Sequence, residues 1–251
     1  MMKPNRTGWW LLAYSLLGAT DTRADYSEPY APLEPALLER VEHFISKGWQ
    51  AIALARGDLN GDEQEDYALV IQKNDPANIQ SSGGLIAADI NTNPRHLLIL
   101  LTRDADDIEA DGEQLIRKRL YRRFIPVPDP EHPDQVEPLS YIGIENGRLE
   151  IKFEAWETVG SWQRSDLTYR FRYRENGHFV LTHFEHFQVN RASGMFKTTH
   201  IDLPKGELIK TSGSMSSPRH RKDSLSFPRD RQWTLCDIKQ PLNFRPDSPV
   251  Q

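Results

Sequence analysis

The chain has 251 residues, of which 38% are hydrophobic and 27% are charged, and its formal net charge at pH 7 is −5. This length and composition predict an ordinary folded protein, and they exclude wholesale disorder, a collagen-like repeat and a disulfide-rich miniprotein. The excess of acidic residues argues against general nucleic-acid binding, which relies on a basic surface.

The N-terminus has the pattern of a secretory signal peptide. Lys3 and Arg6 precede an apolar run over residues 9–19, which is too short to span a bilayer but has the length of a signal-peptide core. A cleavage site is expected after Ala24. We therefore expect residues 1–24 to be removed, leaving a soluble periplasmic or secreted protein without a membrane span. The alternative is a buried N-terminal helix.

A single helix is predicted early in the mature chain. Apolar residues between positions 37 and 45 recur with the 3.6-residue period of a helix, Pro35 suits the first turn, and Gly48 follows the end. Residues 50–56 and 67–72 are short apolar runs on either side of a polar loop, as expected for a β-hairpin. We expect the helix to cover one face of the sheet that this hairpin begins.

The polar loop of this hairpin has the pattern of a calcium site. Oxygen-bearing side chains occupy alternate positions at Asp58, Asn60, Asp62 and Asp66, and the backbone carbonyl of Gln64 occupies the remaining alternate position. Ca²⁺ takes about 6–8 oxygen ligands, and three carboxylates this close together repel one another without a cation between them. We predict one structural Ca²⁺ here. The alternative is an acidic turn held by Asx-type hydrogen bonds, without a metal.

Residues 57–70 resemble the segment GDLNGDGxxDYALV of a family of small exported bacterial proteins of unknown function. More generally, the loop resembles the FG-GAP type of calcium loop in integrin-like propeller blades. The resemblance implies a calcium-binding hairpin in an exported protein, and it assigns no activity. Glu63 stands where this pattern has glycine, and a non-glycine residue in a left-handed conformation costs about 1–2 kcal/mol. A single loop of this kind cannot close a propeller, which needs several blades.

The remainder of the chain predicts an antiparallel meander. Residues 96–102 are the most apolar run after the signal peptide, and residues 115–124 are expected to pair with them. Asn-Gly pairs at 146–147 and 176–177 each lie between two β-like runs, and this dipeptide favours a type I′ turn. Residues 195–211 are expected to continue the meander.

The predicted fold class is therefore mainly β (α+β). Residues 25–211 form the β domain, in which an N-terminal helix packs on an antiparallel meander with a single calcium-loop hairpin, but without a full propeller. The following segment is rich in Ser, Pro and basic residues, which predicts a largely flexible tail over residues 212–251. Cys236 is the only cysteine, so no intrachain disulfide can form.

Two further groups of residues are candidate sites. His183, His186 and Glu185 lie close together in the sequence, but on a strand the two histidines point to opposite faces, which disfavours a zinc site, although one completed by His200 is an alternative. Basic residues at 117–123 are expected on both faces of an edge strand as a solvated edge, and an anion-binding site is the alternative.

These patterns predict an exported, non-enzymatic binding or envelope-associated protein with one structural calcium-binding loop. Its partner is an unknown protein, peptide or glycan, and nucleic acid is not expected. The alternative function is a secreted hydrolase whose active site combines histidines and carboxylates from distant parts of the sequence.

Overall fold

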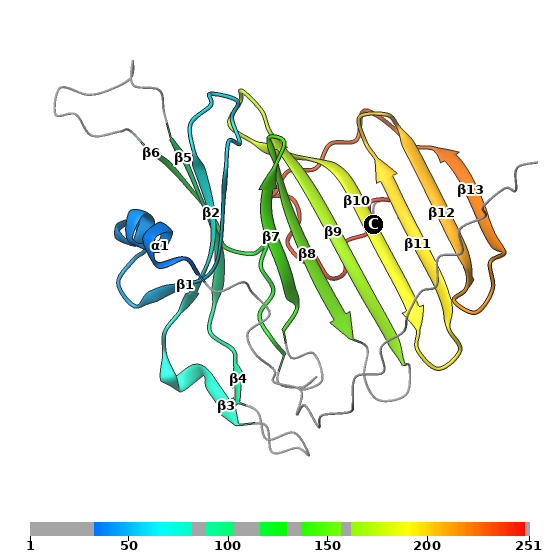
Figure 1. Cartoon of the computed structure of the whole chain (residues 1–251), viewed down its shortest axis with the longest axis horizontal. Coiled ribbons are helices and arrows are strands. Elements are labelled where there is room, and N and C mark those ends of the chain that lie inside the picture. The colour runs from blue at the N-terminus through cyan, green and yellow to red at the C-terminus, as the bar shows by residue number, and fades with distance from the viewer. Residues whose placement is uncertain (1–32, 82–88, 103–115, 130–136, 157–161, 249–251) are drawn as a thin grey trace, which may run out of the picture.

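The computed structural model describes residues 33–81, 89–102, 116–129, 137–156 and 162–248. The chain forms two main antiparallel sheets, and a short helix lies outside the smaller sheet (Figure 1). The predicted signal peptide, residues 1–24, lies outside the described residues. None of the helices in the described part of the chain has the length and apolar character that crossing a bilayer requires.

The smaller sheet has the strand order β1-β2-β5-β6. Its strands are β1 (Trp49–Gly57), β2 (Asp66–Lys73), β5 (Arg95–Thr102) and β6 (Ile116–Tyr121). The predicted hairpin around the acidic loop is confirmed as β1 and β2, and β6 pairs with β5 as predicted. The central strands β2 and β5 are almost continuously apolar because both of their faces are buried.

The predicted packing of the N-terminal helix on the sheet is confirmed. Helix α1 (Pro35–Val41) continues into the 3₁₀ turn η1 (Glu42–Phe44). Val41 and Leu37 pack in a cluster with Leu98 and other apolar side chains of β2 and β5. The outer face of the smaller sheet is therefore covered, and its inner face is free to pack on the larger sheet.

The larger sheet has the strand order β13-β12-β11-β10-β9-β8-β7, so its strands follow one another as the meander that the sequence predicted. Its strands are β7 (Leu139–Glu145), β8 (Arg148–Trp156), β9 (Gln163–Tyr173), β10 (Phe179–Asn190), β11 (Met195–Asp202), β12 (Glu207–Ser214) and β13 (His220–Ser226). A small two-stranded ribbon of β3 (Ile79–Ser81) and β4 (Asp89–Asn91), preceded by the turn η2 (Pro76–Asn78), lies outside both sheets.

The two Asn-Gly turns differ from each other. Asn146 and Gly147 both have positive φ, 51° and 68°, as a type I′ turn requires. In the second turn only Gly177 has positive φ, so the type I′ prediction is wrong there. The N–H group of Gly177 donates to the carbonyl of Arg174 (2.7 Å), which closes a longer hairpin loop with the glycine in the left-handed position.

Residues 212–248 differ from the flexible tail that the sequence predicted. The strand β13 pairs with β12, and the segment after β13 returns along the larger sheet, where Leu235 and Ile238 are each only 2% exposed. Thr234 forms an isolated β-bridge with Val180. Residues 233–238 alternate only weakly, which predicts at most an edge strand, so their sequence pattern does not reveal that this segment completes the core.

The main core lies where the two sheets and the C-terminal segment meet. Ile99 and Val70 of the smaller sheet, Phe171 and Tyr169 of the larger sheet, and Leu235 of the C-terminal segment belong to one buried cluster. The hydroxyl group of Tyr169 donates to the carbonyl of Pro241 (2.5 Å), which fixes the C-terminal segment against β9. This packing brings the β1–β2 loop and the β9–β10 turn to the same end of the molecule, at the top of Figure 1.

Candidate functional site

The acidic loop connects β1 to β2 and contains the five predicted calcium ligands, Asp58, Asn60, Asp62, Gln64 and Asp66. The Asp58 carboxylate accepts hydrogen bonds from the N–H groups of Gly61 (2.6 Å) and Glu63 (3.1 Å). The Asn60 side-chain oxygen accepts from the N–H group of Asp62 (3.1 Å), whose own carboxylate accepts from Gln64 N–H (2.9 Å). The loop is therefore wound around its own side-chain oxygens by Asx-type bonds.

Asp66 anchors the loop to the smaller sheet. Its side chain is buried, and its two oxygens accept hydrogen bonds from the N–H groups of Leu59 and Thr102, both at 2.8 Å. Burial raises the pKa of this carboxyl to about 6, although both backbone hydrogen bonds act in the opposite direction. Asp62 and Asp58 add like charge, which also raises the pKa.

Two residues of the loop have a left-handed backbone conformation, which favours glycine. Gly61 has a φ of 85° and Glu63 a φ of 63°, so both residues lie in the left-handed region. Glu63 therefore occupies a position that favours glycine, as its departure from the family pattern suggested. Its N–H group still bonds to Asp58, so the strain does not open the loop.

The donor atoms of the loop fit a hard cation, since all of them are carboxylate, amide or carbonyl oxygens. Among the described residues, no group of three His, Cys, Asp or Glu side chains is arranged to hold a metal ion. The loop oxygens instead bond to backbone N–H groups. A carboxylate oxygen has two lone pairs, so an oxygen that accepts a hydrogen bond from a backbone N–H group can still coordinate a cation with the other lone pair. Calcium at this loop stays a prediction.

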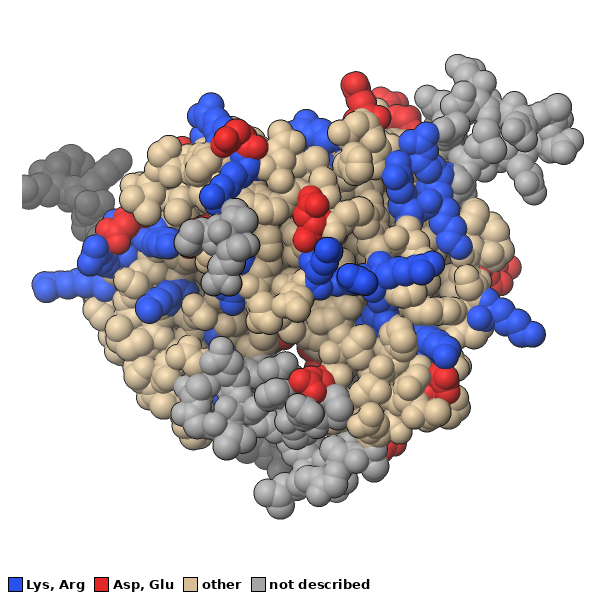
Figure 2. All heavy atoms as spheres, turned by 180° about the vertical axis from the view of Figure 1, so that it is seen from behind, with Lys and Arg blue, Asp and Glu red and all other residues tan. Residues whose placement is uncertain are grey.

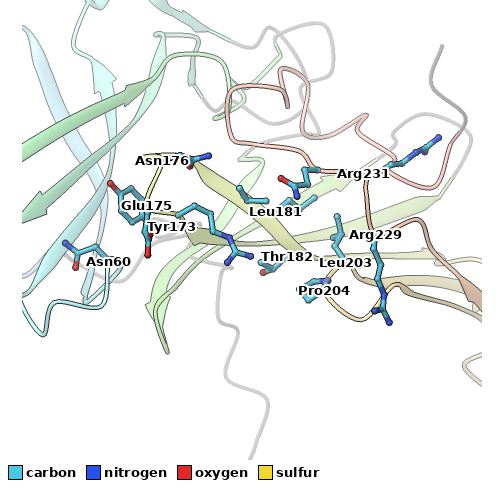
Figure 3. A pocket seen from close by; sticks show the side chains of 13 residues that line it. Asn60, Tyr173, Glu175, Asn176, Leu181, Thr182, Leu203, Pro204, Arg229 and Arg231 are labelled. Carbon is cyan, nitrogen blue, oxygen red and sulfur yellow. The ribbon is translucent and has the colours of Figure 1, made fainter.

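An open cleft of about 730 Å³ lies beside the loop, and we call it the end cleft. It is built from the acidic loop, the end of β9, the β9–β10 turn, the start of β10, the β11–β12 turn and the C-terminal segment. Figure 3 shows Asn60 at one end of the cleft and Arg229 and Arg231 at the other. Its lining residues combine polar, charged and apolar side chains: Asn60, Tyr173, Arg174, Glu175, Asn176, Val180, Leu181, Thr182, Leu203, Pro204, Arg229, Arg231 and Gln232.

A smaller hollow of about 140 Å³ adjoins the end cleft. Asn60 and Tyr173 line both spaces, and Arg117 and Thr102 complete the smaller one. Arg117 donates a hydrogen bond to the hydroxyl group of Tyr173 (3.4 Å). A predicted calcium ligand, Asn60, is therefore also a wall residue of both spaces.

The basic residues of β6 are divided between two faces, as the sequence predicted for an edge strand. Lys118 donates to the carbonyl of Phe44 (2.6 Å) on the helix side. Arg117 and Arg119 lie on the other side, toward the β9–β10 turn, where the Arg119 guanidinium group packs against Gly177.

The histidines of the larger sheet do not form a zinc site. His183 lies 3.2 Å from Asp202, and His200 lies 3.0 Å from Glu185, so the two form separate histidine–carboxylate pairs. His186 lies on the opposite face, as predicted for a strand, and is 4% exposed. Burial lowers its pKa to about 4. None of these histidines lines the end cleft.

No protein family, curated protein or solved structure in the comparisons matches this chain. The sequence pattern identifies the loop but not the arginines of the cleft, because Arg174 ends a run predicted as an ordinary strand and Arg229 and Arg231 lie in the predicted flexible tail.

Proposed function

We propose that this chain is an exported, non-enzymatic binding protein, that its ligand occupies the end cleft, and that a structural Ca²⁺ in the loop from Asp58 to Asp66 holds one wall of the cleft. The volume of about 730 Å³ is within the range of small-molecule sites, which is about 300–1,000 Å³. The signal-peptide pattern supports export to a compartment where weak extracellular calcium sites are occupied.

The position of Asn60 is the observation that carries this proposal. Its side chain belongs to the loop, where it bonds to Asp62, and it also lines the end cleft. It further donates to the carbonyl of Thr102 (3.3 Å), at the end of β5. An ion that fixes the loop would therefore also fix this wall, which gives the calcium a role in shaping the binding site.

A hydrolase is the second candidate, and the histidine–carboxylate pairs are the feature that favours it. The pair of His183 and Asp202 has the geometry of a general base held by a carboxylate. However, Asp202 is also paired with Lys205 (3.0 Å), and neither pair lines the end cleft. The described lining residues of the cleft present guanidinium, amide and hydroxyl groups with a single carboxylate, that of Glu175, and this set suits holding a ligand better than proton transfer.

Thermal melting of the purified chain in EGTA and in millimolar CaCl₂ tests the calcium part of the proposal. We expect CaCl₂ to raise the melting temperature, and we expect Asp58→Ala and Asp62→Ala to remove the increase, since each variant deletes a carboxylate ligand. Asp223→Ala, at a partly exposed acidic residue of β13, is the matched control and should keep the full increase. An equal melting temperature in both buffers would contradict the proposal.

A further inference from the structure

The cleft also indicates what kind of molecule it binds. We propose that the end cleft binds an acidic oligosaccharide, whose carboxylates pair with the arginines of the cleft and whose hydroxyl groups bond to its amide side chains. This inference rests on the proposed function, because it takes the end cleft as the ligand site, and it names the chemical class of the ligand.

The charge of the cleft favours an anion. Arg174, Arg229 and Arg231 line it, and Glu175 is the only acidic residue among the described lining residues. The ion pairs among the described residues include none for these three arginines. Figure 2 shows Lys and Arg side chains spread across the upper half of the face opposite to the view of Figure 1, with Asp and Glu side chains among them. A planar guanidinium group binds a carboxylate through two parallel hydrogen bonds, which gives both strength and orientation.

One of these arginines is held in place without being neutralised. The guanidinium group of Arg229 donates to the carbonyl of Lys205 from Nε (3.1 Å) and from Nη2 (2.7 Å). These bonds restrict the side chain while its full positive charge remains. Binding an anion there would cost less side-chain entropy than binding it to a free arginine.

The neutral groups of the cleft favour a saccharide. Asn176 and Gln232 offer amide groups, and Tyr173 offers a half-buried ring beside a hydroxyl group. The Asn176 side-chain oxygen accepts from the N–H group of His178 (3.1 Å), which orients the amide so that its NH₂ group is left for a ligand. Amide and phenol groups of this kind suit the hydroxyl groups and apolar ring faces of sugars.

The backbone of the cleft disfavours an acidic peptide. An extended peptide binds best by adding a strand to an open sheet edge. Here the strand that lines the cleft, β10, lies between β9 and β11. The N–H group of Leu181 already donates to the carbonyl of Trp233 (2.8 Å), and the carbonyl of Thr182 accepts from Leu203 N–H (3.0 Å). Recognition must therefore come from side chains, as for a saccharide.

Calorimetric titration with charged and neutral saccharides tests this inference. Trigalacturonate and its methyl ester are titrated into the calcium-loaded chain, with blank titrations into the same buffer to subtract the heat of calcium binding by the sugar. We expect trigalacturonate to bind, its affinity to fall with added NaCl, and the neutral ester to bind about tenfold more weakly or not at all, because it cannot form the charged pairs.

Matched arginine variants show whether binding occurs in the cleft. Arg174→Gln should weaken trigalacturonate binding about tenfold, the loss expected for one charge-assisted pair. Arg219→Gln removes an exposed arginine that lies outside the cleft, before β13, and should leave the affinity unchanged. Equal melting temperatures of the two variants show that both are folded, and an equal loss of affinity in both would overturn the inference.

Two further probes separate this inference from the proposed function. If hexaglutamate binds as tightly as trigalacturonate and depends on Arg174, the saccharide class is wrong while the cleft remains a binding site. If inorganic phosphate competes at the same concentration as the sugar acid, the cleft binds simple anions, and the inference is again wrong. If none of the probes binds, both the inference and the assignment of the cleft as the ligand site are overturned.

Discussion

Asp66 is the side chain on which the conformation of the acidic loop depends most. Replacing it by alanine leaves the N–H groups of Leu59 and Thr102 without their acceptor, in a buried position. Each unsatisfied buried group costs about 1–3 kcal/mol. We expect Asp66→Ala to lower the free energy of unfolding by about 2–4 kcal/mol in urea titrations with EGTA present.

Asp223→Ala, at an exposed ion pair, should change the same free energy by less than about 0.5 kcal/mol. Similar small effects in both variants would show that the N–H groups at Asp66 find other acceptors, contrary to this account of the loop.

Glu63 carries a backbone strain that a glycine would remove. Its φ of 63° costs an L-residue about 1–2 kcal/mol, which a glycine would not incur. Glycine has greater freedom in the unfolded chain, and this destabilises the folded state by about 0.5–1 kcal/mol and offsets part of the gain. We expect Glu63→Gly to raise the free energy of unfolding by about 0.5–1 kcal/mol.

The opposite change, from glycine to a residue with a side chain, can be made at Gly61, which has a φ of 85°. No atom lies within 4 Å of a Cβ added there, so Gly61→Ala tests backbone strain alone and should destabilise the chain by about 1 kcal/mol. Chemical denaturation measures both variants, and a loss of stability in Glu63→Gly would refute the strain.

His186 predicts a loss of stability in mild acid. Burial lowers its pKa to about 4, with the charge of Arg245 acting in the same direction. In the unfolded chain the pKa is 6.5, so unfolding takes up a proton between these values and is favoured as the pH falls from 6.5 to 4. At full effect this contributes about 3 kcal/mol, and the contribution is absent above pH 6.5.

The variant His186→Gln should reduce the slope of unfolding free energy against pH in this window, because glutamine does not titrate. His178→Gln, at an exposed position in the β9–β10 turn, should keep the slope of the original chain. Denaturation curves between pH 4 and pH 7 measure the slope, and identical slopes in the two variants would contradict the assignment.

At the scale of elements, the C-terminal segment is part of the core. Leu235 is 2% exposed, whereas its neighbour Cys236 is exposed. Leu235→Ala should therefore lower the free energy of unfolding by about 2–4 kcal/mol, the usual cost of a cavity in a core. Cys236→Ala should change it by less than about 0.5 kcal/mol. Small effects in both would favour the flexible tail that the sequence predicted.

Local elements were predictable from the sequence, because their signals lie within a few residues. The apolar stripe from 37 to 45 predicted the helix, and Asn146 with Gly147 predicted a type I′ turn that the backbone confirms. The same dipeptide at 176–177 gives a wrong prediction. The last paired residues there are Tyr173 and Phe179, with five residues between them instead of two, and only Gly177 is left-handed.

Long-range packing was not predictable in this way. The apolar residues after position 227 become buried only when they pack on the larger sheet, where the N–H group of Leu235 donates to the carbonyl of Phe179. The site divides similarly. The spacing from Asp58 to Asp66 was visible in one segment, whereas the end cleft joins Asn60, Arg174 and Arg229, which are distant in the sequence.

For the whole molecule, the central claim is that a single Ca²⁺ in the acidic loop fixes one wall of the end cleft. The two sheets meet at this end, and Asn60 belongs both to the loop and to the cleft. Ligand binding should therefore depend on the calcium concentration, because loss of the ion would free this wall.

Equilibrium dialysis of the purified chain against radiolabelled calcium is the most direct test of this claim. We predict saturable binding of one Ca²⁺ per chain with a Kd of about 10⁻⁴–10⁻³ M, and its loss in Asp62→Ala but not in Asp223→Ala. If binding does not saturate even at calcium concentrations above about 10⁻³ M, or if Asp62→Ala binds as much calcium as the original chain, the claim of a single Ca²⁺ in the acidic loop is wrong.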